Sequence, residues 1–180
     1  ADRHTQDTYG FSILEIVREN PKYLRVGTSV VEHPDGVLNV TQFTQVALTV
    51  LSVAGVADLR SKGIAPKDSW FCGHSVGEYS ALCAVTDLFS LENLVDAVYH
   101  RGITMQEYVA RDEKGRSDYL MGVIRPNKIG MSGSAAIELI EDVHSESGFP
   151  IYVVNHNVAD RQYAVAGHIK AIAALREKLS

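Results

Sequence analysis

The spacing of apolar residues predicts a short helix near the start of the chain. Residues 11–19, FSILEIVRE, place Phe11, Ile13, Leu14 and Val17 on one helical side, and Asn20-Pro21 ends the segment. Residues 22–40 are mixed, and the tetrapeptide HPDG at 33–36 indicates a turn between two Val-rich extended pieces. This part of the chain is therefore expected to combine a helix with irregular and extended structure.

A longer helix is predicted next. Thr41 or Thr44 is expected to cap it, and it should run to Lys62 and stop at Gly63. Its residues 46–59 are apolar nearly all round, which predicts a helix buried on most sides.

A short apolar strand, 69–72, and an amphipathic helix, 91–109, follow this helix. The pattern changes after the charged segment RDEKGRSD at 111–118, which contains Gly115 and is expected to connect two units. Beyond it we predict, in order, strand 119–125, helix 133–147, strand 150–157, strand 161–167 and helix 168–179.

The order of elements after the linker is that of a ferredoxin-like split unit lacking only its last strand. We therefore predict an α/β protein with a large unit at 1–110, a linker at 111–118 and a ferredoxin-like small unit at 119–180. The missing strand, together with the start at Ala1, predicts that both units are incomplete.

Composition narrows the function classes. The 180 residues carry a net charge of −5 without long runs of one sign, so neither nucleic acid nor a membrane surface is an expected partner. No segment is expected to be apolar enough to span a membrane, and the N-terminus does not have the pattern of a signal peptide. Cys72 and Cys83 stand eleven apart without metal-ligand spacing, so we expect reduced thiols, no metal site and a cytoplasmic protein.

The segment GHSVG at 73–77 fits the G-x-S-x-G nucleophile elbow, in which a strand turns sharply into a helix and exposes the serine. A side chain at Gly73 or Gly77 would be expected to crowd the turn. Ser75 would be the nucleophile, and the backbone N–H of Val76 would stabilise the oxyanion. The five-residue pattern alone is common by chance, but the predicted strand before it and helix after it favour acyl transfer.

A serine nucleophile needs a base, which is normally histidine. His74 adjoins Ser75, and neighbouring side chains on a sharp turn diverge. The local sequences around the downstream histidines do not mark a base, although His156 stands at the end of a predicted strand. We expect none of these residues to be the base.

Arg101 is the second informative residue. In the helix that begins at Leu91, Arg101 shares a face with Leu94, Val98 and Met105. A guanidinium on an apolar stripe either extends to solvent, pairs with an internal carboxylate, or binds a substrate carboxylate with its planar fork. Periodicity alone leaves these alternatives open.

These motifs resemble a known family. GHSVGEYSAL, followed by RGITMQ at Arg101 and preceded by TQFTQVAL, resembles the malonyl-CoA:acyl-carrier-protein transacylases. The segments DTYGFSILEIV, RDEKGRSDY and NHNVADRQYAVAG are similar to the malonyl/palmitoyl transferase domain of type I fatty acid synthases, the multifunctional kind of fungi and mycobacteria. The resemblance covers nearly the whole chain and implies an acyltransferase fold, with an α/β-hydrolase-like large subdomain and an inserted ferredoxin-like small subdomain.

The resemblance also implies roles for particular residues. Ser75 would carry the acyl group, Val76 would donate to the oxyanion and Arg101 would hold the malonyl carboxylate. Gln45 matches a glutamine that lines the family's site, although a structural role at the helix end fits equally well. Asn155 and Asn157 match a pair of the small subdomain near the cleft.

Two departures from the family pattern are evident. Family members usually read TQPAL where this chain has TQVAL, so Val46 replaces a helix-starting proline. The resemblance implies that the family's glycine- and glutamine-containing loop, which supplies another oxyanion contact, is to be expected before Ala1. Its catalytic histidine follows the ferredoxin-like subdomain, so we expect the base beyond Ser180 and no activity of these 180 residues alone.

The implied substrates are malonyl-CoA, CoA and the phosphopantetheine of an acyl carrier protein domain, with no metal or redox cofactor. The implied partners are the other domains of the synthase, in a parent that forms a large homo-oligomer. Three alternatives remain: the acyltransferase domain of a polyketide synthase, a serine esterase or thioesterase, and a non-catalytic structural fragment. An esterase would follow the elbow with further strands, an acidic residue and a histidine, whereas a ferredoxin-like unit follows it here.

Overall fold

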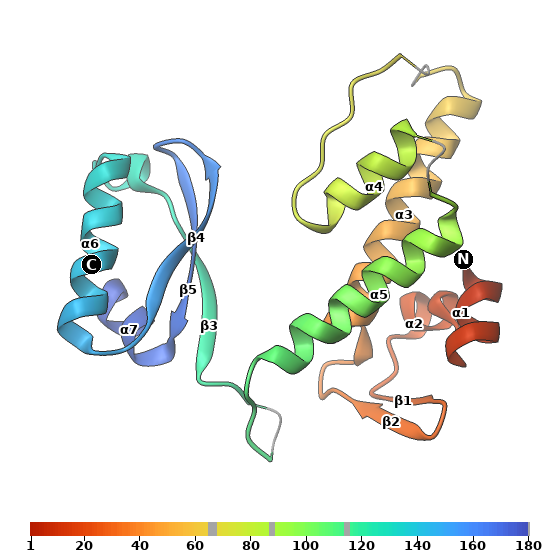
Figure 1. Ribbon diagram of the computed structural model, residues 1–180, viewed down its shortest axis with the longest axis horizontal. Helices are drawn as coiled ribbons and strands as arrows, with labels where there is room; N and C mark the ends of the chain where they lie inside the picture. Colours follow the sequence, from red (N-terminus) through yellow and green to blue (C-terminus); the bar gives the residue numbers. More distant parts are fainter. Residues whose placement is uncertain (65–67, 87–88, 114–115, 180) are drawn as a thin grey trace. The chain divides into compact units, whose positions relative to one another are not determined.

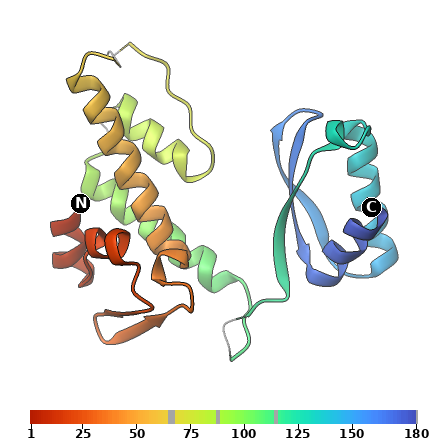
Figure 2. The same cartoon turned by 180° about the vertical axis from the view of Figure 1, so that it is seen from behind.

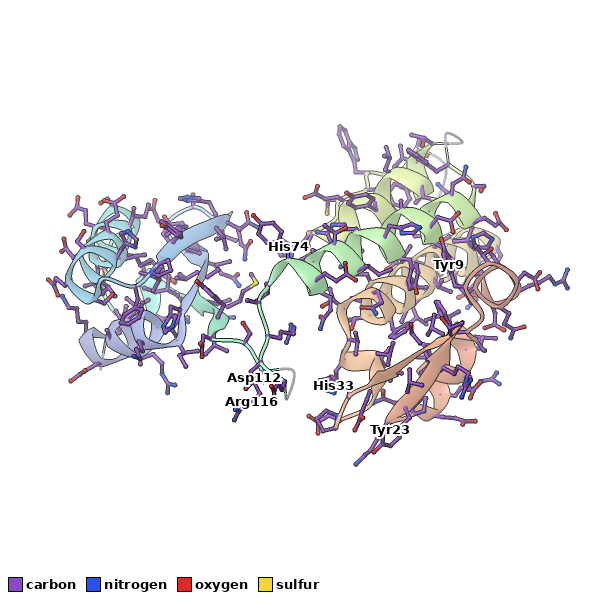
Figure 3. The ribbon with its side chains drawn as sticks, turned by 60° about the horizontal axis from the view of Figure 1, so that its bottom comes forward. Tyr9, Tyr23, His33, His74, Asp112 and Arg116 are labelled. Atoms are coloured by element: carbon purple, nitrogen blue, oxygen red, sulfur yellow. The ribbon has the colours of Figure 1, made fainter. Side chains whose placement is uncertain are left out.

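The chain forms two compact units, Ala1–Tyr108 and Val109–Ser180 (Figure 1). The computed structural model describes residues 1–64, 68–86, 89–113 and 116–179. Each unit has its own hydrophobic core, and neither cluster of buried residues contains a side chain of the other unit. The division falls two residues before the end that the sequence suggested for the large unit, and Gly115 of the expected linker lies outside the described residues. Within that linker Arg116 pairs with Asp112 at 2.7 Å (Figure 3).

The large unit is mainly helical. Its described elements are α1 (Asp2–Tyr9), α2 (Ile13–Glu19), β1 (Tyr23–Val26), β2 (Ser29–Glu32), the 3-10 turn η1 (Val37–Asn39), α3 (Thr41–Ser61), α4 (Val76–Val85) and α5 (Leu91–Tyr108). Helices α3 and α5 lie side by side in Figures 1 and 2, and α4 packs beside α3. A Cβ on Gly102 would stand 2.3 Å from the Cα of Gln42, so the absence of a side chain there lets α5 approach α3 closely. This packing brings the N-terminal half of α3 to the part of α5 that carries Arg101.

The N-terminal helices follow local signals in part. Helix α2 confirms the predicted helix and begins at Ile13, because the Ser12 side chain accepts a hydrogen bond from the Glu15 N–H at 3.1 Å. Ile13 and Ile16 face the core, whereas Leu14 is 45% exposed. Helix α1 was not predicted, since its sequence, DRHTQDTY, has no apolar stripe.

The extended segment before α3 differs from expectation. Strands β1 and β2 form an antiparallel hairpin whose connection contains Gly27 at φ +58°, so the hairpin reverses there. The turn at 33–36 is present, but it leads into η1 and not into a second extended piece. The interpretation of residues 37–39 as extended was therefore wrong, whereas Val40 has extended backbone.

Helix α3 corrects two further expectations. Its N-cap residue is Val40, which has no capping side chain, and the Thr44 hydroxyl donates instead to the carbonyl oxygens of Leu38 and Val40. Burial is confined to the N-terminal half, because Leu51 is 59% exposed and Leu59 is 40% exposed. The helix was thus wrongly expected to be buried on most sides.

By length and hydropathy α3 also meets the criteria for a membrane span, contrary to the expectation that no segment would. Over its most apolar 18 residues the mean hydropathy is 1.3, and 28% of that window is buried. The core helix of a water-soluble protein passes the same test, and Phe43 and Val46 of α3 belong to the core.

The strand predicted at residues 69–72 is not formed. These residues are irregular, and Trp70 is fully exposed. A strand requires a neighbour for its backbone N–H and C=O groups. Among the described residues the sheet of the large unit is the β1–β2 hairpin, whose strands pair with each other. Residues 69–72 therefore have no neighbouring strand in the described part of the large unit with which their backbone could pair.

The small unit confirms the predicted order of strand, helix, strand, strand and helix. Its elements are β3 (Tyr119–Ile124), the 3-10 turn η2 (Pro126–Lys128), α6 (Gly133–Ser147), β4 (Ile151–Val158), β5 (Gln162–His168) and α7 (Ile169–Lys178). The strand order is β3-β5-β4, and both pairs are antiparallel. Val123 of β3 lies opposite Ala164 of the central strand β5, and Val153 of β4 lies opposite Val165. Helices α6 and α7 cover one face of this sheet (Figures 1 and 2), as a ferredoxin-like unit requires.

Candidate active site

Ser75 occupies a strained turn immediately before α4. It is the N-cap residue of the helix, with φ +55° and ψ −117°, and it is one of three described non-glycine residues with positive φ. Residues other than glycine rarely adopt this backbone conformation, and such backbone strain concentrates at functional sites. The side chain is exposed. The sharp turn and the helix of a nucleophile elbow are therefore present, although the preceding strand is not.

The two glycines of the motif have different roles. A Cβ on Gly73 would stand 2.0 Å from the carbonyl oxygen of Gly77 and 2.4 Å from the amide nitrogen of Glu78. A Cβ on Gly77 meets no described atom within 4 Å. The expected crowding is confirmed for Gly73 and wrong for Gly77, because only position 73 faces the backbone across the turn.

The start of α4 offers backbone donors beside Ser75. The Gly77 N–H donates to the His74 carbonyl at 2.9 Å, and the Glu78 N–H donates to the Ser75 carbonyl at 3.1 Å. Val76 is the first residue of α4, so its N–H has no acceptor within the helix. The positive end of the helix dipole lies at the same place. These features suit an oxyanion that forms next to the Ser75 hydroxyl, and the role of Val76 stays a prediction.

Arg101 reaches Ser75 from α5. Its Nη2 donates to the Ser75 Oγ at 3.2 Å, and its Nη1 donates to the Gln45 Oε1 at 2.5 Å. The apolar stripe is confirmed for Leu94 and Val98, which are buried, whereas Met105 is 45% exposed. The ion pairs found among the described residues do not include Arg101. Of the alternatives left open by the sequence, pairing with an internal carboxylate is therefore not observed in the described chain.

Gln45 belongs to this cluster and not to the helix end. It lies inside α3, is 5% exposed, and its Nε2 points to the Met105 sulfur at 3.5 Å. Its carbonyl oxygen orients one side of the Arg101 guanidinium. The expected place of Gln45 beside the site therefore agrees with the geometry, while the alternative of a structural role at the helix end does not.

Tyr79 is the site residue that the sequence analysis missed. Its ring lies under the guanidinium carbon of Arg101, 5.6 Å from ring centroid to Cζ, within the range of a cation–π contact. Tyr79 follows Ser75 by four positions at the start of a helix. That spacing places the ring on the same side as the serine, and this is the signal that would have found it.

Two predicted residues belong to the small unit. Asn155 and Asn157 lie on β4, with Asn155 opposite Ala164 in the sheet. Their approach to Ser75 stays a prediction, because Ser75 belongs to the large unit.

The downstream histidines contact other rings. His100 lies against Tyr9 and Tyr99, while His144, His156 and His168 lie against Tyr152, Tyr163 and Phe149. His74, labelled in Figure 3, directly precedes Ser75 in the chain. Cys72 and Cys83 are free thiols, and the described residues hold no group of three or more His, Cys, Asp or Glu side chains arranged for a metal ion.

Comparison with known proteins identifies the family of the chain. The family model of the acyl transferase domain matches residues 1–178. This chain belongs to the acyl transferase domain family. It is 37% identical to the fatty acid synthase subunit beta of Saccharomyces cerevisiae and 38% identical to that of Schizosaccharomyces pombe, in each case over all of this chain. The chain spans 11% of the length of these two relatives.

Solved acyltransferases share the fold. FabD from Acinetobacter baumannii superposes with a TM-score of 0.74 and 25% identity, over 99% of this chain and 48% of that protein. A malonyl transacylase solved in complex with a type II polyketide acyl carrier protein gives a TM-score of 0.73 and 26% identity, over 99% of this chain and 49% of that one. The α/β acyltransferase fold is thereby confirmed, with about half of the neighbours' length represented. The polyketide synthase and esterase alternatives are not favoured, since the curated relatives are fatty acid synthase beta subunits.

Proposed function

We propose that this acyltransferase chain moves malonyl and palmitoyl groups between CoA and the phosphopantetheine of an acyl carrier protein, as part of a type I fatty acid synthase. The observation that carries the proposal is the Arg101 guanidinium, which stands 3.2 Å from the Ser75 hydroxyl without an ion-pair partner among the described residues. A cation held next to a strained serine suits an acyl group that ends in a carboxylate.

The proposed reaction proceeds in two half-steps. The Ser75 Oγ attacks the thioester carbonyl of malonyl-CoA, the C–S bond breaks, and CoA leaves as a thiol with the proton that Ser75 gives up. The carrier thiol then attacks the serine ester and regenerates the hydroxyl. The Val76 N–H would stabilise the oxyanion of both tetrahedral intermediates, and the family resemblance implies a histidine after the small unit as the base.

Arg101 would distinguish the two acyl groups. A malonyl carboxylate would accept two parallel hydrogen bonds from the guanidinium. In the structure one of these donor nitrogens, Nη1, donates to Gln45 and the other, Nη2, donates to Ser75. A palmitoyl chain has no carboxylate, so Arg101 would turn toward solvent as the chain enters.

The remaining expectations follow from this chemistry. Exchange of a thioester for a serine ester moves no electrons, so the proposed reaction requires no metal or redox cofactor. Its partners would be the carrier domain and the other domains of the synthase, as the similarity to the beta subunits supports. The large homo-oligomeric parent stays a prediction. We expect the protein to act in the cytoplasm.

The test is acylation of a protein that extends this chain at both ends, incubated with malonyl-CoA or palmitoyl-CoA and analysed by mass spectrometry of the Ser75 peptide. Arg101→Ala should lower malonyl loading about 30- to 100-fold, the effect of losing charge-assisted hydrogen bonds, and should change palmitoyl loading by less than about threefold. Ser75→Ala should abolish both. Equal loss of both substrates in Arg101→Ala would remove its carboxylate role, and rapid acylation of the 180 residues alone would contradict the expected need for a base beyond Ser180.

A further inference from the structure

The Arg101 side chain is held from two directions. Its N–H groups donate to Gln45 and Ser75, and its Cζ lies over the ring of Tyr79, 5.6 Å from the ring centroid. A cation–π contact uses the positive charge of the guanidinium and not its N–H groups, so the ring holds the cation without occupying the donors that a carboxylate would use.

Tyr79 is itself well placed to hold Arg101. It lies on the first turns of α4, four residues after Ser75, and is 39% exposed. The backbone that fixes the strained serine therefore also fixes the ring. An acidic side chain at this position would neutralise the guanidinium, whereas a neutral ring leaves the positive charge available to a ligand.

We propose that Tyr79 is a positioning residue that sets the preference for acyl groups ending in a carboxylate, by holding the Arg101 guanidinium beside Ser75 without using its N–H donors. The inference rests on the proposed function and extends it to a residue outside the nucleophile and the cation. Without the ring, the long arginine side chain samples more rotamers, and binding a malonyl carboxylate must overcome that freedom.

The effect should appear in binding of malonyl-CoA. In the extended protein, Tyr79→Leu should raise the KM for malonyl-CoA about three- to fivefold, the size of an exposed cation–π contact, with kcat changed by less than about twofold. Loading of palmitoyl-CoA should change by less than about twofold. Tyr79→Phe keeps the ring and should behave as the wild type.

The experiment compares Tyr79→Leu, Tyr79→Phe and the control Tyr108→Leu, a substitution at a tyrosine that is 89% exposed at the end of α5. Retained palmitoyl loading shows that each variant is folded at the site. Equal loss of both substrates in Tyr79→Leu, or a Tyr79→Phe variant that matches Tyr79→Leu, overturns the role of Tyr79 while the proposed function stands. Failure of the wild type to load malonyl at Ser75 overturns both.

Discussion

At the scale of single residues, the turn around Ser75 depends on one of its two glycines. The Cβ of any other residue at position 73 would collide with the backbone of Gly77 and Glu78, which begins α4. Backbone atoms cannot move aside as a flexible side chain does, so a substitution at position 73 must shift the helix start.

We expect Gly73→Ala to lower the free energy of unfolding by about 1–3 kcal/mol, the usual cost of overpacking. Gly77→Ala, in open space within a helix, should be neutral or stabilising by up to about 1 kcal/mol, because alanine favours helix more than glycine. Urea unfolding followed by circular dichroism measures both values. Equal destabilisation by the two substitutions would contradict this account of the turn.

At the scale of elements, a polar cluster ties α1 to α5. The Asp96 Oδ1 accepts hydrogen bonds from the Tyr9 hydroxyl at 2.7 Å and from the His4 Nε2 at 2.6 Å (Figure 3 labels Tyr9). Burial alone would raise the pKa of Asp96, but the hydrogen bonds from His4 and Tyr9 outweigh it and hold the pKa below its usual range. Burial, and then the hydrogen bond to Asp96, raises the pKa of Tyr9 above its usual range. The ionised carboxylate of Asp96 is therefore the form that binds α1 to α5.

Asp96→Asn should lower the free energy of unfolding by about 1 kcal/mol, a modest value because the side chain is partly exposed to solvent. A carboxyl whose pKa is lowered by folding stabilises the protein above its unfolded value of about 4 and loses that contribution as pH falls through the lower folded value. The difference between wild type and variant should therefore be full at pH 6 and shrink below about pH 4.

Urea unfolding across this pH range measures the difference. Asp7→Asn, which removes an exposed carboxylate of α1, serves as the control. A wild-type advantage that persists at pH 2.5 would refute the assignment to Asp96.

At the scale of the whole molecule, the two units have separate cores. Ile140 belongs to the buried cluster of the small unit and Ile16 to that of the large unit, and each is at most 1% exposed. Elements that share one hydrophobic core unfold together in a single transition, so two units with separate cores should unfold in two transitions.

Ile140→Ala should lower the stability of the small unit by about 2–5 kcal/mol and leave the large unit unchanged, because the cavity forms in one core only. Ile16→Ala should do the reverse. Hydrogen exchange resolved by mass spectrometry reports the units separately. Loss of protection across both units in either variant would show that they unfold together.

The small unit was predictable because its elements are specified locally. Helix α6 has a period-3.6 pattern with a serine cap at Ser132 and a left-handed glycine at Gly148, and β4 and β5 form a hairpin. Strand β3 pairs with the distant β5, as the predicted ferredoxin-like order requires. Helix α1 was missed because it is held by polar contacts to Asp96, which leave no apolar stripe. The burial of α3 was overestimated because composition does not say which of its faces is covered.

The sequence by itself determined the family of this chain, the nucleophile motif at Ser75 and the order of elements in the small unit, since each is written in neighbouring residues. The tertiary structure decided which side chains surround that serine. Arg101 lies 26 residues from Ser75 and 56 residues from Gln45 in the sequence. The close packing of α3 on α5 at Gly102 brings Arg101 and Gln45 together. It also decided that residues 69–72 are not a strand, because a strand forms only where another lies beside it.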